Sequence, residues 1–451
     1  MNRTTILSVA IAIISLGGAL AMRPVQVEPK PYEDTGDLLF PEFTDPSLAT
    51  SLEVLSWDEE ASRMVSFKVE QKDGRWVIPS HNDYPADGTD RMGKAAASFI
   101  DVRRDIVRSE RAEDHAAFGV EDPDKADGSG RGQRVTIGDA SGGALVDVIV
   151  GKTVDDKPGY RYVRFPGQKR VYASKLKLDV STQFTDWIEK DLLKIDKDSI
   201  VKLISDSYKV DEKEGKVTGR DPLSVALVAP EGGDPSARAW QPADDIQLPE
   251  GKEVDKSKVS QVLGAIDRLN IVGVRPRPAQ LTLGALQAKG FFVTPDGSRL
   301  FGNEGELRAV CDDGVVYTLY FGEVTFDSGL ALTAGAGAGV GAGDSAEGDG
   351  EKKANRFMFV DVAYDPAYDK GAAKPELTEG APAAELPAGP GLDRAQKLQK
   401  RFDQWFYVIS DDAFQQMHKD KDDFLKDAGA SSAAPGMPMP MPGGLPPGFG
   451  G

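Results

Sequence analysis

One arrangement of residues occurs twice in this chain of 451 residues, and this repetition is the strongest constraint on the fold. In each copy a Trp and a Pro precede a polar stretch, which leads into apolar residues at i, i+3, i+4, i+7 and i+10. This spacing predicts one apolar face of an α-helix. The two sets are Met92, Ala95, Ala96, Phe99 and Val102, and then Val259, Val262, Leu263, Ile266 and Leu269, each 167 residues after its counterpart.

Neighbouring segments repeat in the same order, with an offset that only grows along the chain. "SLEVLSWD" (51–58) resembles "SIVKLISD" (199–206), Trp76 matches Trp240, and Gly151 matches Gly322 at an offset of 171. Further on, "QFTDWIEKD" (183–191) is aligned with "RFDQWFYVI" (401–409). Insertions into the surface loops of a duplicated unit produce such a drift. We therefore predict an α+β fold of two duplicated units of mixed or antiparallel sheet with amphipathic helices. A helix carrying Trp187 or Trp405 closes each unit.

The composition along the chain predicts its division. The first α+β unit spans 51–195 and the second spans 196–425. Gly/Ala-rich and Pro/Ala-rich stretches predict low-complexity insertions at 331–354 and 369–391 within the second unit. Residues 24–50 contain five prolines and no clear period, which predicts an extended spacer. Residues 426–451 predict a disordered Met/Pro/Gly tail.

The N-terminal segment predicts an exported protein. A run of 19 uncharged, mostly apolar residues from Thr4 to Met22 lies between Arg3 and Arg23. That length is close to what a membrane-spanning helix requires. Two interpretations remain: a retained signal anchor over residues 1–23, which we favour, and a signal peptide cleaved after Ala19-Leu20-Ala21. The anchor predicts a single-pass membrane protein with most of the chain outside the cytoplasm.

Charge and residue usage narrow the classes of function. The formal net charge is −18 and no basic patch is present, which argues against nucleic acid as a partner. A solvated acidic surface is the simplest explanation of the charge. The single cysteine, Cys311, cannot form an intramolecular disulfide and lies in an apolar–polar alternation typical of a buried position. His81, His115 and His418 are far apart in polar sequence surroundings, so we predict no metal site from them.

Three glycine- or aspartate-containing stretches resemble ligand-binding loops but lack required residues. "VDVIVGKT" (146–153) has Val146 where a phosphate-binding loop needs glycine, and the second copy has Glu323 in place of Lys152. "GAGAGVGAG" (335–343) contains no G-x-G-x-x-G in any frame. "DPDKADGSG" (122–130) lacks the glycine and the glutamate of a calcium loop. We therefore predict no nucleotide, no cofactor and no metal ion.

Catalytic residues are likewise not predicted. Adjacent acidic pairs such as Asp155-Asp156 point to opposite faces of a strand, and no Ser/His/Asp arrangement or known hydrolase motif is present. The tryptophans are interpreted as core residues. Two alternatives stay open: a ligand- or glycan-binding module that uses aromatic residues such as Tyr160, Tyr162 and Trp240, and an envelope hydrolase whose residues converge only in three dimensions.

Several of these segments together resemble the domain-of-unknown-function family 4340. The resemblance rests on the order of "WVIP" (76–79), "PAD" (85–87), an amphipathic helix ending in "DIV", "FGVEDPD" (118–124), "IVGK" (149–152), "YRYVRF" and "RVYAS" (170–174). It is clear over residues 51–190 and weaker in the second half.

The resemblance implies a membrane-anchored bacterial protein, in some cases an auxiliary component of gliding-motility-type ABC transporters. Together with the predicted anchor, it places the chain in a bacterial inner (cytoplasmic) membrane as a single-pass protein with most of its length in the periplasm. It carries no active-site residues over to this chain. We therefore expect a non-enzymatic extracytoplasmic accessory or scaffold component of a membrane transporter assembly, with transporter subunits as protein partners.

Overall fold

The computed structural model describes residues 34–58, 62–125, 129–211, 216–230, 234, 237–244, 246–277, 282–327, 329–335, 353–372 and 389–429. These residues form two compact units. Unit 1 contains the described residues up to Asp58, together with Arg63–Val65 and Gly93–Val180. Unit 2 contains Ser66–Met92 and the described residues from Ser181 onward. The division falls inside strand β2 (Arg63–Lys72) and helix α2 (Thr89–Ala97).

An antiparallel sheet forms unit 1, with the strand order β2-β1-β6-β7-β8-β9-β5, where β2 contributes only its first three residues. Its strands are β1 (Ser51–Asp58), β5 (Ile106–Ser109), β6 (Gln133–Gly138), β7 (Ala144–Thr153), β8 (Tyr160–Arg164) and β9 (Val171–Lys175). Alternate side chains are buried, as in β1, where Leu52 and Val54 have no exposed area. Helix α3 (His115–Phe118) lies between β5 and β6 in the chain.

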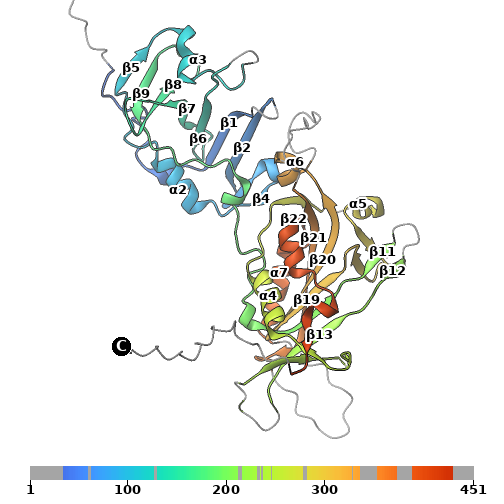
Figure 1. Ribbon diagram of the computed structural model, residues 1–451. Coiled ribbons are helices and arrows are strands. Elements are labelled where there is room, and N and C mark those ends of the chain that lie inside the picture. Colours follow the sequence, from blue (N-terminus) through green and yellow to red (C-terminus); the bar gives the residue numbers. More distant parts are fainter. Residues whose placement is uncertain are drawn as a thin grey trace, which may run out of the picture. The chain divides into compact units, whose positions relative to one another are not determined.

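Unit 2 contains a second antiparallel sheet of eight strands in the order β14-β13-β10-β19-β20-β21-β22-β16. They are β10 (Ile200–Asp206), β13 (Leu223–Val228), β14 (Ala239–Pro242), β16 (Gly273–Pro276), β19 (Glu306–Cys311), β20 (Asp313–Thr325), β21 (Asn355–Asp369) and β22 (Trp405–Ser410). Strands β3 (Arg75–Ile78) and β4 (Tyr84–Pro85) also belong to unit 2, where they extend β2. Helix α7 (Gly391–Phe402) packs along β20 and β21 (Figure 1).

Shorter elements complete unit 2. Three two-stranded sheets pair β11 (Lys209–Asp211) with β12 (Lys216–Thr218), β15 (Lys252–Val254) with β23 (Leu425–Asp427), and β17 (Phe291–Val293) with β18 (Leu300–Gly302). The remaining helices are α4 (Lys256–Asp267), α5 (Leu283–Gln287), α6 (Gly329–Ala334) and α8 (Asp411–Met417). The fold is thus mostly antiparallel sheet with a few helices, in agreement with the predicted α+β class.

Apart from β4, which has no counterpart in the second sheet, the two sheets have the same strand order when their strands are matched along the chain. β1, β2 and β3 match β10, β13 and β14, β5 matches β16, and β6 to β9 match β19 to β22. A glycine contact also recurs. A Cβ on Gly151 would lie 2.5 Å from the Phe118 carbonyl oxygen, and a Cβ on Gly322 would lie 2.3 Å from that of Lys289. Glycine is needed at both positions because the backbone passes so closely, which also accounts for the "GK" of strand β7.

Both predicted helical faces are buried. All ten apolar residues of the repeated pattern are at most 6% exposed. Helix α2 ends at Ala97 and α4 ends at Asp267, so the last residues of each pattern lie beyond the helix. Asp255 caps the start of α4 by accepting a hydrogen bond from the Ser257 backbone N–H at 2.8 Å. Trp187 and Trp405 are buried as predicted, whereas Trp76 on β3 and Trp240 on β14 are half-buried.

The predicted closing helices are wrong in both copies. Around Trp187 the chain forms only the short 3₁₀ helix Phe184–Asp186, because the Trp187 carbonyl accepts the Asp87 backbone N–H at 2.7 Å. Trp405 begins strand β22, whose aromatic and β-branched residues favour a sheet. Helix α7 precedes this strand instead of containing it. The alignment of Trp405 with Trp187 is therefore also wrong, because β22 matches β9.

The described part of the predicted spacer is packed into unit 1, to which it belongs. The Leu39 backbone N–H donates to the Val102 carbonyl at 2.7 Å, and Phe43 is 1% exposed. The Phe40 ring contacts the Phe99 ring edge-on, with centroids 6.1 Å apart. Residues 34–50 thus differ from the free, extended spacer that their prolines indicated, because their apolar side chains find a partner in the core.

Several other predictions fall mainly outside the described residues. These are the anchor over residues 1–23, spacer residues 24–33 and most of the insertions and the tail. The described edges of these segments belong to ordered elements: residues 331–334 end α6, Gly391 begins α7 and Lys426 lies in β23. Among the residues that the structure describes, no helix has the length and apolar character needed to cross a bilayer.

Candidate functional site

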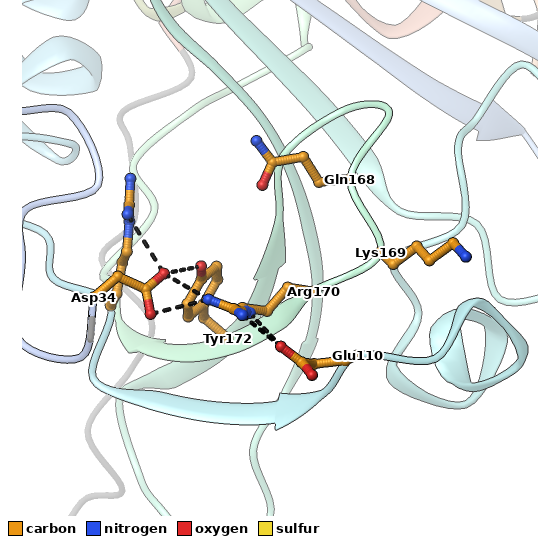
Figure 2. A pocket seen from close by; sticks show the side chains of 7 residues that line it. Asp34, Glu110, Gln168, Lys169, Arg170 and Tyr172 are labelled. Carbon is orange, nitrogen blue, oxygen red and sulfur yellow. Dashed lines mark hydrogen bonds and ion pairs between the residues drawn. The ribbon is translucent and has the colours of Figure 1, made fainter. Parts of the chain in front are cut away.

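A polar cavity of about 490 Å³ in unit 1 surrounds the carboxylate of Asp34; we call it the Asp34 cavity (Figure 2). Its charged walls come from the loops that flank β5 and from the start of β9. Arg170 donates to the Asp34 carboxylate at 2.9 Å, and the Tyr172 hydroxyl donates to it at 2.6 Å. Arg104 approaches it at 3.5 Å. The cradle therefore holds a carboxylate of the chain itself.

Electrostatics stabilise this contact in its ionised form. The hydrogen bond from Tyr172, followed by the charge and hydrogen bonds of Arg170, holds the pKa of Asp34 below its usual value. Arg170 also binds Glu110 on its other side. In Figure 2 the Lys169 side chain points away from the Asp34 carboxylate. The two acidic residues of this cavity are thus both paired with Arg170, and the site ties residue 34 to the sheet.

A second cavity, of about 410 Å³, lies in unit 2 over three neighbouring strands; we call it the aromatic cavity. Its floor is formed by Tyr320 on β20, Phe359 on β21 and Phe406 on β22. Tyr320 is the registered partner of Phe359, and the rings of Phe359 and Phe406 have centroids 5.7 Å apart. Alternate residues of a strand point to the same face, so these three rings form one row across the sheet.

The sides of the aromatic cavity come from elements that precede the three floor strands in the chain. Leu286 on α5 and Val293 and Leu300 on the β17–β18 hairpin contribute apolar walls. Phe291 stacks on Phe406 with a centroid distance of 5.4 Å and fixes the hairpin over the sheet. The volume lies within the range of small-molecule sites, which are mostly apolar with a few polar groups.

Five polar side chains give the aromatic cavity its chemical character. Arg299 binds the buried Glu306 at 3.2 Å, and Gln399 donates to Asp361 at 3.1 Å. Burial raises the pKa of Tyr320 to about 12, so its hydroxyl keeps its proton at neutral pH. Within the described residues this hydroxyl has no hydrogen-bond partner, and no acidic side chain pairs with Arg277, another lining residue. The cavity therefore offers one unused donor and one unneutralised cation.

The matching place in the first sheet is filled by the chain. Ile149, Arg164 and Val171 are registered partners on β7, β8 and β9, the strands that match β20, β21 and β22. Arg164 is 2% exposed and donates to the carbonyls of Val120 and Gln168 at 2.8 and 3.0 Å. It also pairs with the Asp122 carboxylate at 3.0 Å. An internal guanidinium thus occupies the position where the second sheet carries Phe359.

The aromatic residues proposed from sequence do not line either cavity. Tyr162 packs against Phe118 with centroids 4.6 Å apart, and Tyr160 lies under the Lys157 ammonium at 5.0 Å. Trp240 is a half-buried residue of β14 in unit 2. Sequence reasoning missed Tyr320, Phe359 and Phe406. A comparison of the two copies could have found them. The first copy has Ile149, Arg164 and Val171 at the matching positions of three successive strands, and the second copy has an aromatic residue at each.

His81 lies in largely apolar surroundings, contrary to the sequence-based expectation. His81 is 1% exposed, stacks on Phe184 at 4.3 Å, and exchanges hydrogen bonds with Ser80 and Thr333. Burial, and then the charge of Arg275, lowers its pKa to about 4. Cys311 is buried and free, as predicted. Over the described ranges no three His, Cys, Asp or Glu side chains are placed to hold a metal ion.

Comparison with known proteins gives one family. Residues 76–288 match the model of the family described as domain of unknown function DUF4340. This range is slightly less than half of the chain, and it runs from β3 past α5, beyond the region of clear resemblance in the sequence. Curated proteins and solved structures give no match. The family predicted from the order of the sequence motifs is thus confirmed, and residues 76–288 of this chain belong to the DUF4340 family.

Proposed function

We propose that this chain is a non-enzymatic, membrane-anchored accessory subunit of an ABC-type membrane transporter, with its folded units outside the cytoplasm. The observation that carries the proposal is the Asp34 contact. Asp34 follows the apolar run of residues 4–22 by twelve residues, which span at most about 40 Å when fully extended. An anchor formed by that run would hold unit 1 close to the membrane surface, where transporter subunits are within reach.

The chemistry of the Asp34 cavity supports a structural use of this site. Asp34 and Glu110 share the same arginine, so neither carboxylate is poised as a proton acceptor for a substrate. The transporter as partner comes from the family resemblance. The hydrolase alternative has no such support, because neither cavity presents an acid–base pair arranged for hydrolysis within the described residues.

We further propose that the two sheets arose by duplication of one unit. The matched strand order, the paired contacts of Gly151 and Gly322, and the shared offset of 171 residues support this. Gly119 and Gly290, which follow α3 and α5, keep that offset and both have a positive φ, of 69° and 76°. A scaffold of two related sheets provides two surfaces of similar geometry, which can diverge separately.

The test is co-purification of the tagged full-length chain from detergent-solubilised membranes, followed by mass spectrometry. We expect an ABC permease and its ATPase to be recovered, and we expect a version with residues 4–22 replaced by a cleavable signal peptide to recover less of them. Recovery without any transporter subunit, in detergent that preserves other membrane complexes, would contradict the proposal. Protease added to intact spheroplasts should digest the folded units, which tests the extracytoplasmic location.

A second candidate function, binding of a small ligand, is favoured by the aromatic cavity. The cavity combines an apolar floor with the Tyr320 hydroxyl and Arg277, and the matching place in the first sheet is closed by Arg164. Retention of a ligand by the purified protein, seen by native mass spectrometry and lost when the cavity is blocked, tests this function. An accessory subunit can also bind a ligand, so the two functions are compatible.

A further inference from the structure

The aromatic cavity has a composition that selects one chemical class of ligand. We propose that it binds a small carboxylic acid with an aromatic or branched apolar body, with the body on Phe359 and Phe406 and the carboxylate at Arg277. This inference rests on the second candidate function, ligand binding, and is independent of the anchor and of the transporter.

The apolar body follows from the floor and the walls. Phe359 and Phe406 are 5% and 2% exposed, so only a small part of each ring is open to the cavity and the rest is packed. Leu286, Val293 and Leu300 face the same space. A ligand that displaces water from these surfaces gains about 25 cal/mol for each Å² of apolar area that it buries. Aromatic rings on the floor favour a flat or branched body through offset or edge contacts.

The carboxylate follows from the one lining cation that the described chain leaves without an acid. The guanidinium carbon of Arg277 is 5.2 Å from the centroid of the Phe359 ring, and one nitrogen donates to the Asp403 carbonyl at 3.2 Å. A carboxylate bound to its other nitrogens would therefore lie beside the aromatic floor. Arg299 is already neutralised by Glu306. Arginine binds carboxylates through two parallel hydrogen bonds, which gives geometric selectivity as well as affinity.

The remaining polar groups restrict where the carboxylate lies. Asp361 repels an anion, and it is fixed by Gln399, whose side-chain oxygen accepts the Val362 backbone N–H at 2.6 Å. A bound carboxylate is thus directed toward Arg277 and away from Asp361. The Tyr320 hydroxyl is protonated and free to donate a hydrogen bond to a ligand oxygen. A cationic ligand would be repelled by Arg277 and Arg299, and Asp361 is the one lining carboxylate that could bind it.

The experiment is calorimetric titration of the purified full-length chain in detergent solution, with the detergent buffer as the blank, so that the result does not depend on membrane insertion. The probes are 4-phenylbutyrate, its neutral amide, 4-phenylbutylamine and acetate. The tripeptide Gly-Gly-Phe and its C-terminal amide test whether the same chemistry can come from the end of a peptide. The blocked variant is Ser298→Trp, because Ser298 is exposed in the hairpin loop at the edge of the cavity. The matched control is Ser141→Trp, in a turn of the same kind in the first sheet.

We expect saturable binding of 4-phenylbutyrate that Ser298→Trp abolishes and Ser141→Trp leaves unchanged. Arg277→Gln should weaken it about tenfold or more, which is the loss of a charge-assisted hydrogen bond. Asp361→Asn should strengthen it a few-fold. Acetate should not bind measurably, because it has no apolar body.

Three results would overturn the proposal, and they differ in what they say about ligand binding. If the amide or the amine binds as tightly as the acid and Arg277→Gln has no effect, the carboxylate assignment fails, although binding blocked by Ser298→Trp would keep the ligand-binding function. If no probe shows saturable binding that Ser298→Trp removes, both the carboxylate assignment and the ligand-binding function fail. Binding of Gly-Gly-Phe but not 4-phenylbutyrate would replace the small molecule with a peptide end.

Discussion

Strands β8 and β21 occupy the same place in two sheets of the same strand order, yet one carries Arg164 and the other Phe359. In the first sheet the arginine is buried and satisfied by two carbonyls and a carboxylate. In the second sheet the phenylalanine belongs to the floor of a cavity. The same arrangement of strands therefore accommodates different side chains at the centre of its face. One sheet uses that face for internal packing, and the other leaves it open.

The comparison depends first on the strand arrangement that the two sheets share. Substitutions at the matched glycines Gly151 and Gly322 test this arrangement. We expect Gly151→Ala and Gly322→Ala each to lower the free energy of unfolding by about 3 kcal/mol or more, because a Cβ would contact a backbone carbonyl at 2.5 or 2.3 Å. Urea denaturation followed by circular dichroism measures the loss. The matched controls are Gly93→Ala and Gly284→Ala in helices α2 and α5, where an added Cβ has no neighbour within 4 Å. They should be neutral or stabilising by up to about 1 kcal/mol. A loss in the controls equal to that in the matched glycines would break the comparison.

Next, the filled face of the first sheet is tested by Arg164→Met. This change leaves the Asp122 carboxylate and the carbonyls of Val120 and Gln168 without their donor, and we expect a loss of about 3 kcal/mol in unfolding free energy. The control is Arg161→Met in the same strand, which loses one bond to the Gly151 carbonyl and should cost about 1 kcal/mol. Thermal denaturation of both variants shows which of them loses more stability. Equal losses for both variants would show that Arg164 does not fill the face as described.

Acid pH should destabilise unit 2, because this unit contains the buried His81. Its pKa is lowered to about 4 from 6.5 by burial, so the unfolded chain binds more protons between those pH values. The stability that neutral His81 provides is complete above pH 6.5 and decreases as the pH falls toward 4. We expect a loss of roughly 3 kcal/mol across this window. Denaturation at pH 7 and at pH 4.5 measures it, and His81→Gln should show a smaller difference. An unchanged pH dependence in that variant would contradict the assignment.

The smallest expected effect concerns the segment that joins unit 1 to the N-terminal run. Asp34→Asn weakens the bonds from Arg170 and Tyr172, and we expect a loss of about 1 kcal/mol at pH 7 because the site is partly exposed. Hydrogen exchange of the Leu39 backbone N–H, which is bonded to Val102, reports the local loosening. Asp37→Asn is the control, since within the described residues the Asp37 side chain makes no hydrogen bond. Equal exchange in the two variants would count against the Asp34 contact.

The pattern of the sequence predicted local structure where that structure depends on periodicity. The two buried helical faces, the strand 51–58 and the hairpin turn at Asp73-Gly74 all follow from spacing and turn residues. The closing helices were wrong because the i, i+3, i+4 spacing of Phe184, Trp187 and Ile188 is also compatible with an irregular segment held by contacts from elsewhere. The Asp87 N–H that binds the Trp187 carbonyl is 100 residues away in sequence, so a local pattern contains no sign of it.

The candidate site was beyond the reach of sequence reasoning for the same reason. Tyr320, Phe359 and Phe406 are spread over 87 residues and meet only because their strands are neighbours in register. The sequence by itself determined the repeated helical faces and the family match, because these depend on the spacing and order of residues along the chain. Only the tertiary structure decided that Asp34 is held by Arg170, that Arg164 fills one sheet and that an open cavity lies over the other. Those outcomes depend on strand order and register, which bring together residues that are distant in the sequence.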